Sequence, residues 1–149
     1  MIRKFKMSDM EEILNIWLKA SIESHYFIEK EYWIDKKSAM KDIYIPNSET
    51  YVHESNGQID GFISLCEDIL AAIFVHPEQQ GRGIGKKLLK KAMDLRENLS
   101  LSVYKENYKS VAFYEKAGFY FVKEKIDSNT GRQEIIMCWS AKRSRRHQN

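Results

Sequence analysis

The sequence has few of the residues that stabilise small proteins covalently or through metals. It contains two cysteines, Cys66 and Cys138, and each lies inside an apolar, strand-like stretch. Such thiols are usually buried and reduced, so the sequence predicts neither a disulfide nor a redox pair. The four histidines show no metal-ligand spacing with each other or with the cysteines, which predicts a protein without a metal site.

Long hydrophobic runs and linkers are absent as well. No apolar run reaches 18 residues, and Met1-Ile2-Arg3-Lys4 leads directly into alternating residues instead of a signal-peptide core. We therefore predict a cytoplasmic protein that is neither exported nor membrane-spanning. The 149 residues suit one domain, which we place at residues 1–140, followed by a basic, disordered tail at 141–149.

The net charge is small and unevenly distributed. Four positive charges fall in the last eight residues, and without them the formal charge of +3 becomes −1. A near-neutral body lacks the electrostatic footprint of a nucleic-acid-binding domain, so we do not expect nucleic acid as a partner. An adaptor that binds nucleic acid through the tail alone stays open as an alternative. The charged tail residues are Lys142, Arg143, Arg145 and Arg146.

Hydrophobic periodicity predicts a mixed α/β protein with the order β-α-α-β-β-β-α-β-α-β-β and helices on both faces of the sheet. Ser8-Asp9-Met10-Glu11 is typical of a capping box at a helix start, and Asn56-Gly57 of a two-residue hairpin turn. The nearly continuous apolar run Ile69–Val75 predicts a central strand covered on both faces. The expected strands are 2–5, 50–54, 58–65, 69–75, 99–104, 119–125 and 134–139, and the later helices are 29–43, 84–95 and 109–117.

Three glycines stand within five residues, between the expected strand at 69–75 and the helix that follows. In "HPEQQGRGIGKKLL", Gly81, Gly83 and Gly85 leave the backbone bare where a helix begins. The free amides and the positive end of the helix dipole then point at one place, which suits a phosphate. Arg82, Lys86 and Lys87 add positive charge. The stretch therefore predicts a phosphate-binding loop.

Two common nucleotide loops do not match this spacing. A Walker loop has four residues between its first glycine and Gly-Lys and then Ser or Thr, whereas here three residues intervene and position 87 is lysine. A dinucleotide fingerprint that starts at Gly83 requires a third glycine where Leu88 stands.

The loop instead resembles the coenzyme A pyrophosphate loop of the GCN5-related N-acetyltransferases, the GNAT family. Gln80-Gly81-Arg82-Gly83-Ile84-Gly85 matches its Gln/Arg-x-x-Gly-x-Gly/Ala pattern. The later stretch "NYKSVAFYEKAGF", residues 107–119, is similar to the family's second signature, Asn-x-x-Ala/Ser-x-x-Phe-Tyr followed by Gly-Phe. The resemblance covers about residues 2–140 and looks closest to the family's small bacterial YiaC/YjaB-type members.

The resemblance implies an enzyme that transfers the acetyl group of acetyl-CoA to a primary amine in a ternary complex, without a metal. In this family acetyl-CoA lies where two central strands splay apart, here 69–75 and 99–104. The resemblance makes Tyr114 the general acid that protonates the departing thiolate. It assigns cofactor binding to Phe74, Val75, Gln80, Gly81, Arg82, Gly83, Ile84, Gly85, Lys86, Asn107 and Ser110.

The sequence does not distinguish between several candidates for the general base and the acceptor. Glu67, His25 or a chain of waters could take the proton from the amine. The acceptor pocket is expected around His25, Tyr26, Tyr32 and Trp33. The acceptor could be a protein lysine, a protein N-terminus or a small-molecule amine, and the protein a monomer or a homodimer. A non-catalytic acyl-CoA-binding sensor on the same fold is the alternative function.

Overall fold

A computed structural model describes residues 1–143, so the predicted tail beyond Arg143 lies outside the described residues. The chain divides into two compact units, Met1–Ala92 and Met93–Asn149, which we describe separately. The predicted order of elements is confirmed. The prediction that residues 1–140 form a single domain stays a prediction.

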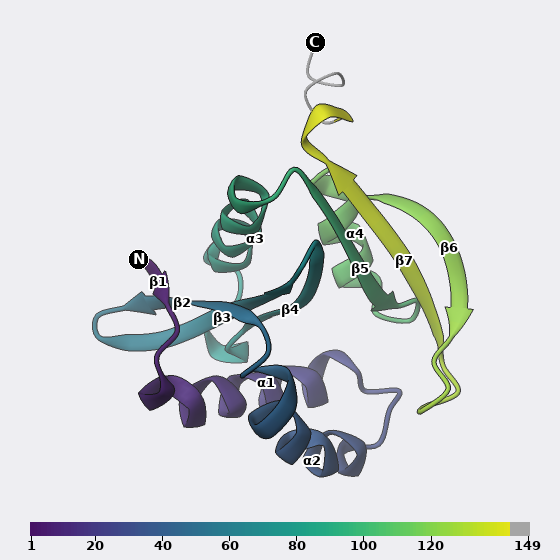
Figure 1. Ribbon diagram of the computed structural model, residues 1–149. Helices are drawn as coiled ribbons and strands as arrows, with labels where there is room; N and C mark the ends of the chain where they lie inside the picture. The colour runs from purple at the N-terminus through teal and green to yellow at the C-terminus, as the bar shows by residue number, and fades with distance from the viewer. Residues whose placement is uncertain (144–149) are drawn as a thin grey trace. The chain divides into compact units, whose positions relative to one another are not determined.

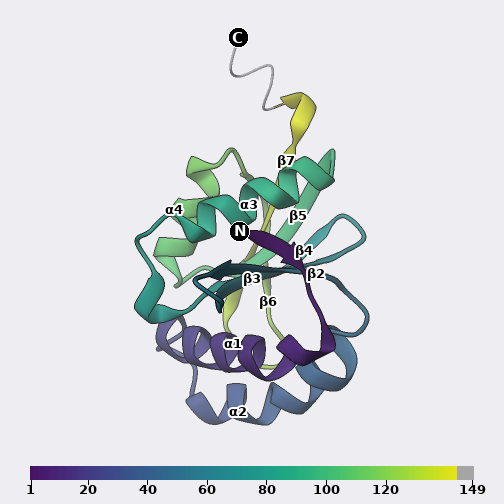
Figure 2. The same cartoon turned by 90° about the vertical axis from the view of Figure 1, so that its left-hand side faces the viewer.

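The first unit is a four-stranded antiparallel sheet in the order β1-β2-β3-β4. Helices α1 and α2 lie on one face of it and α3 on the other (Figures 1 and 2). The last turn of α3 extends into the second unit. The elements are β1 Ile2–Lys4, η1 Met7–Asp9, α1 Met10–Ser24, α2 Lys30–Ala39, η2 Met40–Tyr44, β2 Glu49–Ser55, β3 Gln58–Cys66, β4 Ile69–Val75, η3 Pro77–Gln79 and α3 Ile84–Leu95.

The start of α1 differs from the predicted capping box. The buried Asp9 accepts a hydrogen bond from the Lys6 amide at 2.8 Å and a bidentate pair from the Arg3 guanidinium at 2.9 and 3.0 Å. Arg3 also donates to Glu54 of β2 at 2.6 Å. The hydrogen bond from Arg3 holds the pKa of Asp9 below its usual value. A charged network thus replaces the expected Ser8–Glu11 exchange and ties β1, η1 and β2 together.

The β2–β3 hairpin has the predicted tight turn and an irregularity that the sequence did not indicate. Asn56 and Gly57 both have positive φ, 53° and 79°, as a type I′ turn requires. Farther along, His53 pairs with Gly61 but Glu54 pairs with Ile59, which leaves Asp60 as an extra residue in β3. This is a β-bulge, a local change in strand geometry that re-aims a side chain.

Strand β4 has the predicted bounds but is less covered than expected. A second bulge leaves Ala71 without a partner in β3, because Ser64 pairs with Ala72 and Leu65 with Leu70. Ala71 and Ile69 are exposed and only Leu70 and Ala72 are buried. The prediction of a strand covered on both faces is therefore wrong, since the continuous apolar run includes a bulge and a partly open segment.

Helix α3 approaches the first sheet closely at one glycine. A Cβ atom on Gly61 of β3 would lie 3.0 Å from Leu88 Cδ1, 3.0 Å from the Phe74 carbonyl oxygen and 3.2 Å from Ile84 Cγ2. Ile84 and Leu88 are buried on the inner face of α3. The missing side chain lets the helix that follows the glycine loop rest directly on β3 and β4.

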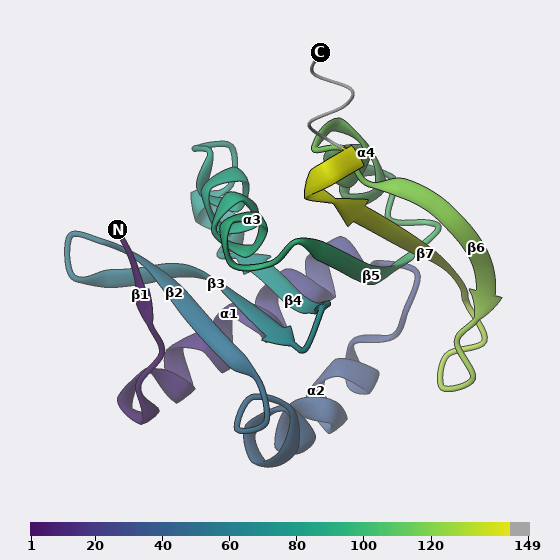
Figure 3. The same cartoon turned by 45° about the horizontal axis from the view of Figure 1, so that its top comes forward.

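The second unit contains three antiparallel strands in the order β5-β7-β6 (Figure 3). Alternate residues of β5 and β7 form its core, with Leu99, Leu101, Met137 and Trp139 buried. Every residue of β6 after Tyr120 is exposed, and a bulge interrupts its pairing with β7 next to Phe121. The elements are β5 Asn98–Tyr104, α4 Tyr108–Lys116, β6 Tyr120–Ile126 and β7 Gln133–Ser140.

The two cysteines are free thiols, Cys138 half-buried and Cys66 exposed at the end of β3. Cys66 is exposed although it lies in an apolar stretch, because β3 ends there and the chain turns. None of the helices over residues 1–143 has the length and apolar character to cross a bilayer. Within the same range no cluster of His, Cys, Asp and Glu could hold a metal ion, and the absence of a metal stays a prediction.

Candidate active site

The glycine loop has the backbone geometry of an anion cradle. Gly81 and Gly83 adopt φ values of 82° and 79°, which other residues reach only with strain. The first hydrogen bond of α3 runs from Lys87 N to the Gly83 carbonyl at 3.1 Å. The amides of Ile84, Gly85 and Lys86 therefore precede the hydrogen-bonded part of the helix and are available to a phosphate.

The end of β4 is held next to this loop. Gln80 Nε2 donates to the Val75 carbonyl at 3.3 Å, which closes the turn between strand and loop. The Phe74 ring stacks on the fully buried Phe62 with 5.7 Å between ring centroids. The structure thus brings Phe74, Val75 and the loop residues 80–86 together in the first unit.

Glu67, one of two predicted bases, lies at the opposite end of β4 from the glycine loop. It forms the β3–β4 turn with Asp68, its side chain is exposed, and its φ is 54°, a left-handed conformation that is uncommon for a non-glycine residue. Strained backbone of this kind occurs at functional sites as well as in tight turns. The turn geometry explains the conformation without a catalytic role.

The predicted acceptor residues cluster where α1 ends and α2 begins, around the buried Trp33. The His25 ring stacks on Trp33 with 4.8 Å between centroids, and Tyr32 meets Trp33 edge-on at 4.9 Å. Trp17 of α1 also contacts Trp33 edge-on at 6.0 Å. His25 and Trp33 are 8% and 6% exposed, so these two rings join α1 to α2 and offer little surface to a substrate.

Burial changes the protonation of His25. It lowers the pKa of His25 to about 4, against a smaller upward effect of a hydrogen bond with the Ser21 backbone. His25 is therefore neutral at pH 7. Of the four aromatic residues, Tyr26 is the one that protrudes, with 75% of its surface exposed, while Tyr32 is half-buried and its hydroxyl accepts a hydrogen bond from Lys36 at 2.8 Å.

The second signature forms the start of α4 in the second unit. Asn107 is the N-cap, and its side-chain oxygen accepts a hydrogen bond from the Ser110 amide at 3.3 Å. Ser110 and Tyr114 are one helical turn apart and share a face of α4. The structure thus brings together the three residues of this unit that the resemblance assigns to the cofactor and the proton.

Tyr114 is buried among aromatic side chains. It is 9% exposed and lies 5.4 Å from Phe113 and 5.6 Å from Phe119, ring centroid to ring centroid. Burial raises the pKa of Tyr114 well above its usual value, because the phenolate would be poorly solvated. The hydroxyl therefore keeps its proton through the neutral and alkaline range, as a general acid must before it donates.

These features agree with comparisons to known proteins. The model of the acetyltransferase (GNAT) domain family matches residues 46–120. The peptidyl-lysine N-acetyltransferase YiaC of Escherichia coli is 36% identical over 140 residues, which cover 93% of this chain and 96% of YiaC. The chain belongs to the GNAT family. It is an N-acetyltransferase of the YiaC/YjaB type, and the predicted family and fold are confirmed.

Other relatives agree with this membership. The peptidyl-lysine N-acetyltransferase YjaB of Salmonella typhimurium is 29% identical and matches 90% of this GNAT chain and 87% of its own length. The solution structure of apo YjaB from E. coli superposes with a TM-score of 0.82 over 93% of this chain and 96% of YjaB, at 24% identity. The PaiA N-acetyltransferase of Thermoplasma acidophilum, solved with coenzyme A, gives 0.76 over 94% and 98% of the chains, at 22% identity.

Sequence reasoning missed three features of the site in this GNAT protein. They are the bulges at Asp60 and Ala71 and the close approach at Gly61. A glycine inside an apolar strand pattern is a signal for close backbone approach, so Gly61 could have been found. The bulges have no local signal, because they depend on which residues pair across the sheet.

Proposed function

We propose that this protein transfers the acetyl group of acetyl-CoA to the side-chain amine of a lysine in a protein. The observation that carries the proposal is the similarity to peptidyl-lysine N-acetyltransferases, which extends over nearly the full length of this chain and of YiaC. The backbone geometry of the glycine loop supports the donor half of the reaction, since a pyrophosphate needs the bare amides that this loop presents.

In the first unit, the backbone of Phe74 and Val75 would bind the pantetheine arm, and the glycine loop would bind the pyrophosphate. The loop residues are Gln80, Gly81, Arg82, Gly83, Ile84, Gly85 and Lys86. In the second unit, Asn107 and Ser110 would hydrogen-bond the arm. Acetyl-CoA supplies the activated acetyl group, and the chain supplies backbone donors and positive charge at the loop.

Tyr114 is proposed as the general acid because burial keeps its hydroxyl protonated. Between the two candidate bases, the structure favours Glu67 over His25. The buried, stacked ring of His25 with its pKa near 4 is poorly placed to accept a proton from an ammonium group. The exposed Glu67 is accessible, and a water chain to solvent remains an alternative route for the proton.

The acceptor would bind at the exposed part of the α1–α2 aromatic cluster, which is Tyr26 with the half-buried Tyr32. An aromatic ring beside a lysine side chain binds its aliphatic stem and favours its charge. We assign structural roles to His25 and Trp33. We also propose that the protein is cytoplasmic, where acetyl-CoA is available, and that it is a monomer or a homodimer.

The test is an acceptor screen with acetyl-CoA in which released thiol is measured and the product is identified by mass spectrometry. The acceptors are peptides with one internal lysine, the same peptides with arginine in its place, peptides whose α-amine alone is free, and spermidine. We expect lysine-dependent thiol release and a mass increase on the lysine. Thiol release with spermidine but with none of the peptides would indicate that the acceptor is a small-molecule amine and not a protein lysine. Acetyl-CoA binding without thiol release from any amine would support the sensor alternative.

A further inference from the structure

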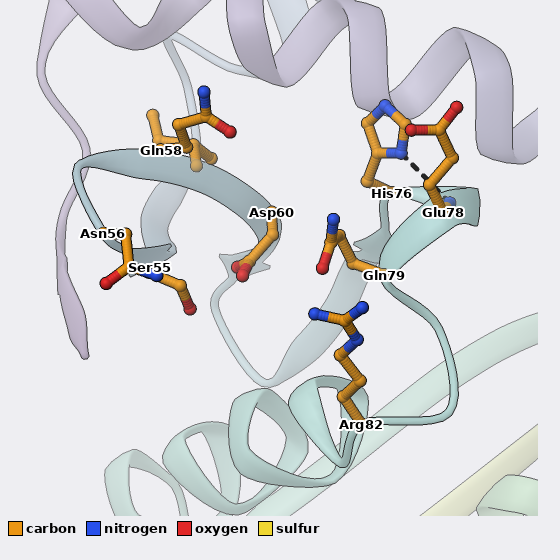
Figure 4. Close-up of a pocket in the computed structure, with 9 residues that line it drawn as sticks. Ser55, Asn56, Gln58, Asp60, His76, Glu78, Gln79 and Arg82 are labelled. Carbon is orange, nitrogen blue, oxygen red and sulfur yellow. Dashed lines mark hydrogen bonds between the residues drawn. The ribbon is translucent and has the colours of Figure 1, made fainter.

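The first unit contains a polar pocket beside the proposed donor loop, with which it shares Arg82. Its volume is about 260 Å³, and it opens between the tip of the β2–β3 hairpin and the segment from His76 to Arg82 (Figure 4). This is smaller than the roughly 300–1,000 Å³ of sites for drug-sized ligands. The lining residues are Ser55, Asn56, Gln58, Ile59, Asp60, His76, Glu78, Gln79 and Arg82.

A buried carboxylate faces this pocket. The Asp60 side chain is 8% exposed, and its Oδ1 lies 2.7 Å from Nδ1 of His53, whose side chain is 5% exposed. Its second oxygen, Oδ2, has no hydrogen-bond partner among residues 1–143. The bulge in β3 gives Asp60 this position, while the His76 amide fixes the strand by donating to the Asp60 carbonyl at 2.8 Å. Oδ2 is not among the fully enclosed side-chain atoms of the described residues, so it is open to the pocket and can accept a hydrogen bond from a ligand there.

A cationic side chain and an amide face Asp60 across the pocket. In Figure 4 the ends of Arg82 and Gln79 point into the same space as the Asp60 carboxylate, whereas Gln58 and Glu78 point away from it. Within the described part of the chain, neither the Arg82 guanidinium nor the Gln79 side-chain amide has a hydrogen-bond or ion-pair partner. Asp60 and Arg82 make no ion pair with each other, so both side chains can contact a ligand that lies between them.

We propose that this pocket binds a free α-amino acid, with the ammonium group at Asp60 and the carboxylate at Arg82. A carboxylate is the natural partner of a guanidinium, with which it forms two parallel hydrogen bonds. An ammonium supplies the donor that Asp60 Oδ2 lacks. A simple cation would leave Arg82 without a partner, and a simple anion would be repelled by the Asp60 carboxylate. The side chain of the amino acid would face the polar hairpin residues Ser55 and Asn56, which favours a small or polar one.

Occupancy of the pocket would affect the donor loop, a consequence that rests on the proposed function. Arg82 stands between Gly81 and Gly83, so a ligand that holds its side chain also restricts the backbone proposed to bind the pyrophosphate. The amino acid and acetyl-CoA would then change each other's affinity by the same factor, since coupling between two sites is reciprocal.

The direct test uses isothermal titration calorimetry with the full chain and the twenty amino acids one at a time, without acetyl-CoA. Leaving out the cofactor separates this proposal from the proposed enzyme function. For any amino acid that binds, the N-acetyl derivative removes the ammonium and the carboxamide removes the carboxylate. We expect each derivative to bind at least about tenfold more weakly, the loss expected for one charged hydrogen-bond partner.

Variants locate the binding in the pocket. Asp60→Asn removes the charge and keeps the shape, and Gln79→Ala removes a less buried contact whose loss leaves the fold intact. We expect about tenfold weaker binding in the first and measurably weaker binding in the second. Gln58→Ala is the matched control and should bind as the unmodified chain does. The proposal is overturned if no amino acid binds, if the two derivatives bind as tightly as the parent, or if Gln79→Ala and Gln58→Ala behave alike.

Discussion

At the scale of single residues, Tyr114 offers the most direct test of the proposed chemistry. Tyr114→Phe removes the hydroxyl and preserves the ring that packs against Phe113 and Phe119. We expect kcat to fall about 10²-fold, the usual contribution of a positioned general acid, with little change in acetyl-CoA affinity. Steady-state kinetics and calorimetry measure the two quantities separately.

Tyr108 provides the control for this substitution. It lies on the same helix and is 72% exposed, so Tyr108→Phe should leave kcat unchanged. Equal turnover in Tyr114→Phe and the unmodified enzyme would remove Tyr114 from the mechanism and leave it as a core residue.

His25 should make the stability of the first unit depend on pH. The unfolded chain binds a proton at His25 near pH 6.5, but the pKa of the buried ring is about 4. The unfolded state therefore takes up the proton first, so stability is complete above pH 6.5 and declines as the pH falls toward 4. We expect a loss of about 2–3 kcal/mol from this residue between pH 7.5 and 4.5.

Urea unfolding at the two pH values measures this effect. His25→Phe keeps an aromatic ring on Trp33 and cannot titrate, so its free energy of unfolding should decline less with falling pH. The carboxylates that titrate in the same range are common to both proteins, and the difference between the two declines isolates His25. Parallel declines would contradict the assignment.

At the scale of elements, two alanine substitutions distinguish a ligand-binding role of the glycine loop from the strain that any turn glycine relieves. Gly83 and Gly131 have φ values of 79° and 74°, and at both positions a Cβ atom would stand in open space, with no heavy atom within 4 Å. Alanine at either site should cost about 1 kcal/mol of stability. Only Gly83→Ala should also weaken acetyl-CoA binding, at least about tenfold, since Gly131 lies in the β6–β7 turn. Calorimetry with both variants measures this, and equal affinities would remove Gly83 from the cradle.

The sequence predicts elements whose signals are local. Asn56-Gly57 requires positive φ at adjacent residues, the apolar run Ile69–Val75 is bounded by turn residues, and both are confirmed. The glycine loop is predictable for the same reason, because the strand, the glycines and the helix start are adjacent in the chain. This local information predicts a phosphate-binding loop, and the resemblance of the second signature to that of the GNAT family narrows the predicted ligand to coenzyme A.

What the sequence could not predict depends on pairing between distant residues. Asp9, just before α1, binds the Lys6 amide and Arg3, and Arg3 also reaches Glu54, 51 residues away. The position of Asp60 depends on the register of two strands, and a shift of one residue would turn its side chain to the other face. Burial of Trp33 and His25 similarly depends on how α1 and α2 meet.

At the scale of the whole molecule, ligand binding should raise thermal stability by mass action. With acetyl-CoA at about one hundred times its Kd, we expect the Tm to rise by about 5–10 °C. ATP and NAD carry a similar pyrophosphate but lack the pantetheine arm, so they should produce a much smaller shift. Stabilisation by ATP or NAD alone, measured by scanning fluorimetry, would contradict the proposed donor.

The outer strand of the second unit has a consequence for handling the protein in concentrated solution. β6 exposes Phe121, Val122 and Ile126, the composition that in a flat edge strand would template fibres. Its bulge and its charged Lys123-Glu124-Lys125 interrupt that edge, because a second copy paired with it in register would place lysine opposite lysine. The strand therefore exposes apolar side chains to water without forming an edge that readily extends into aggregates. Substitution of Lys123 and Lys125 by neutral residues should make the stored protein aggregate sooner, before any loss of activity is measured.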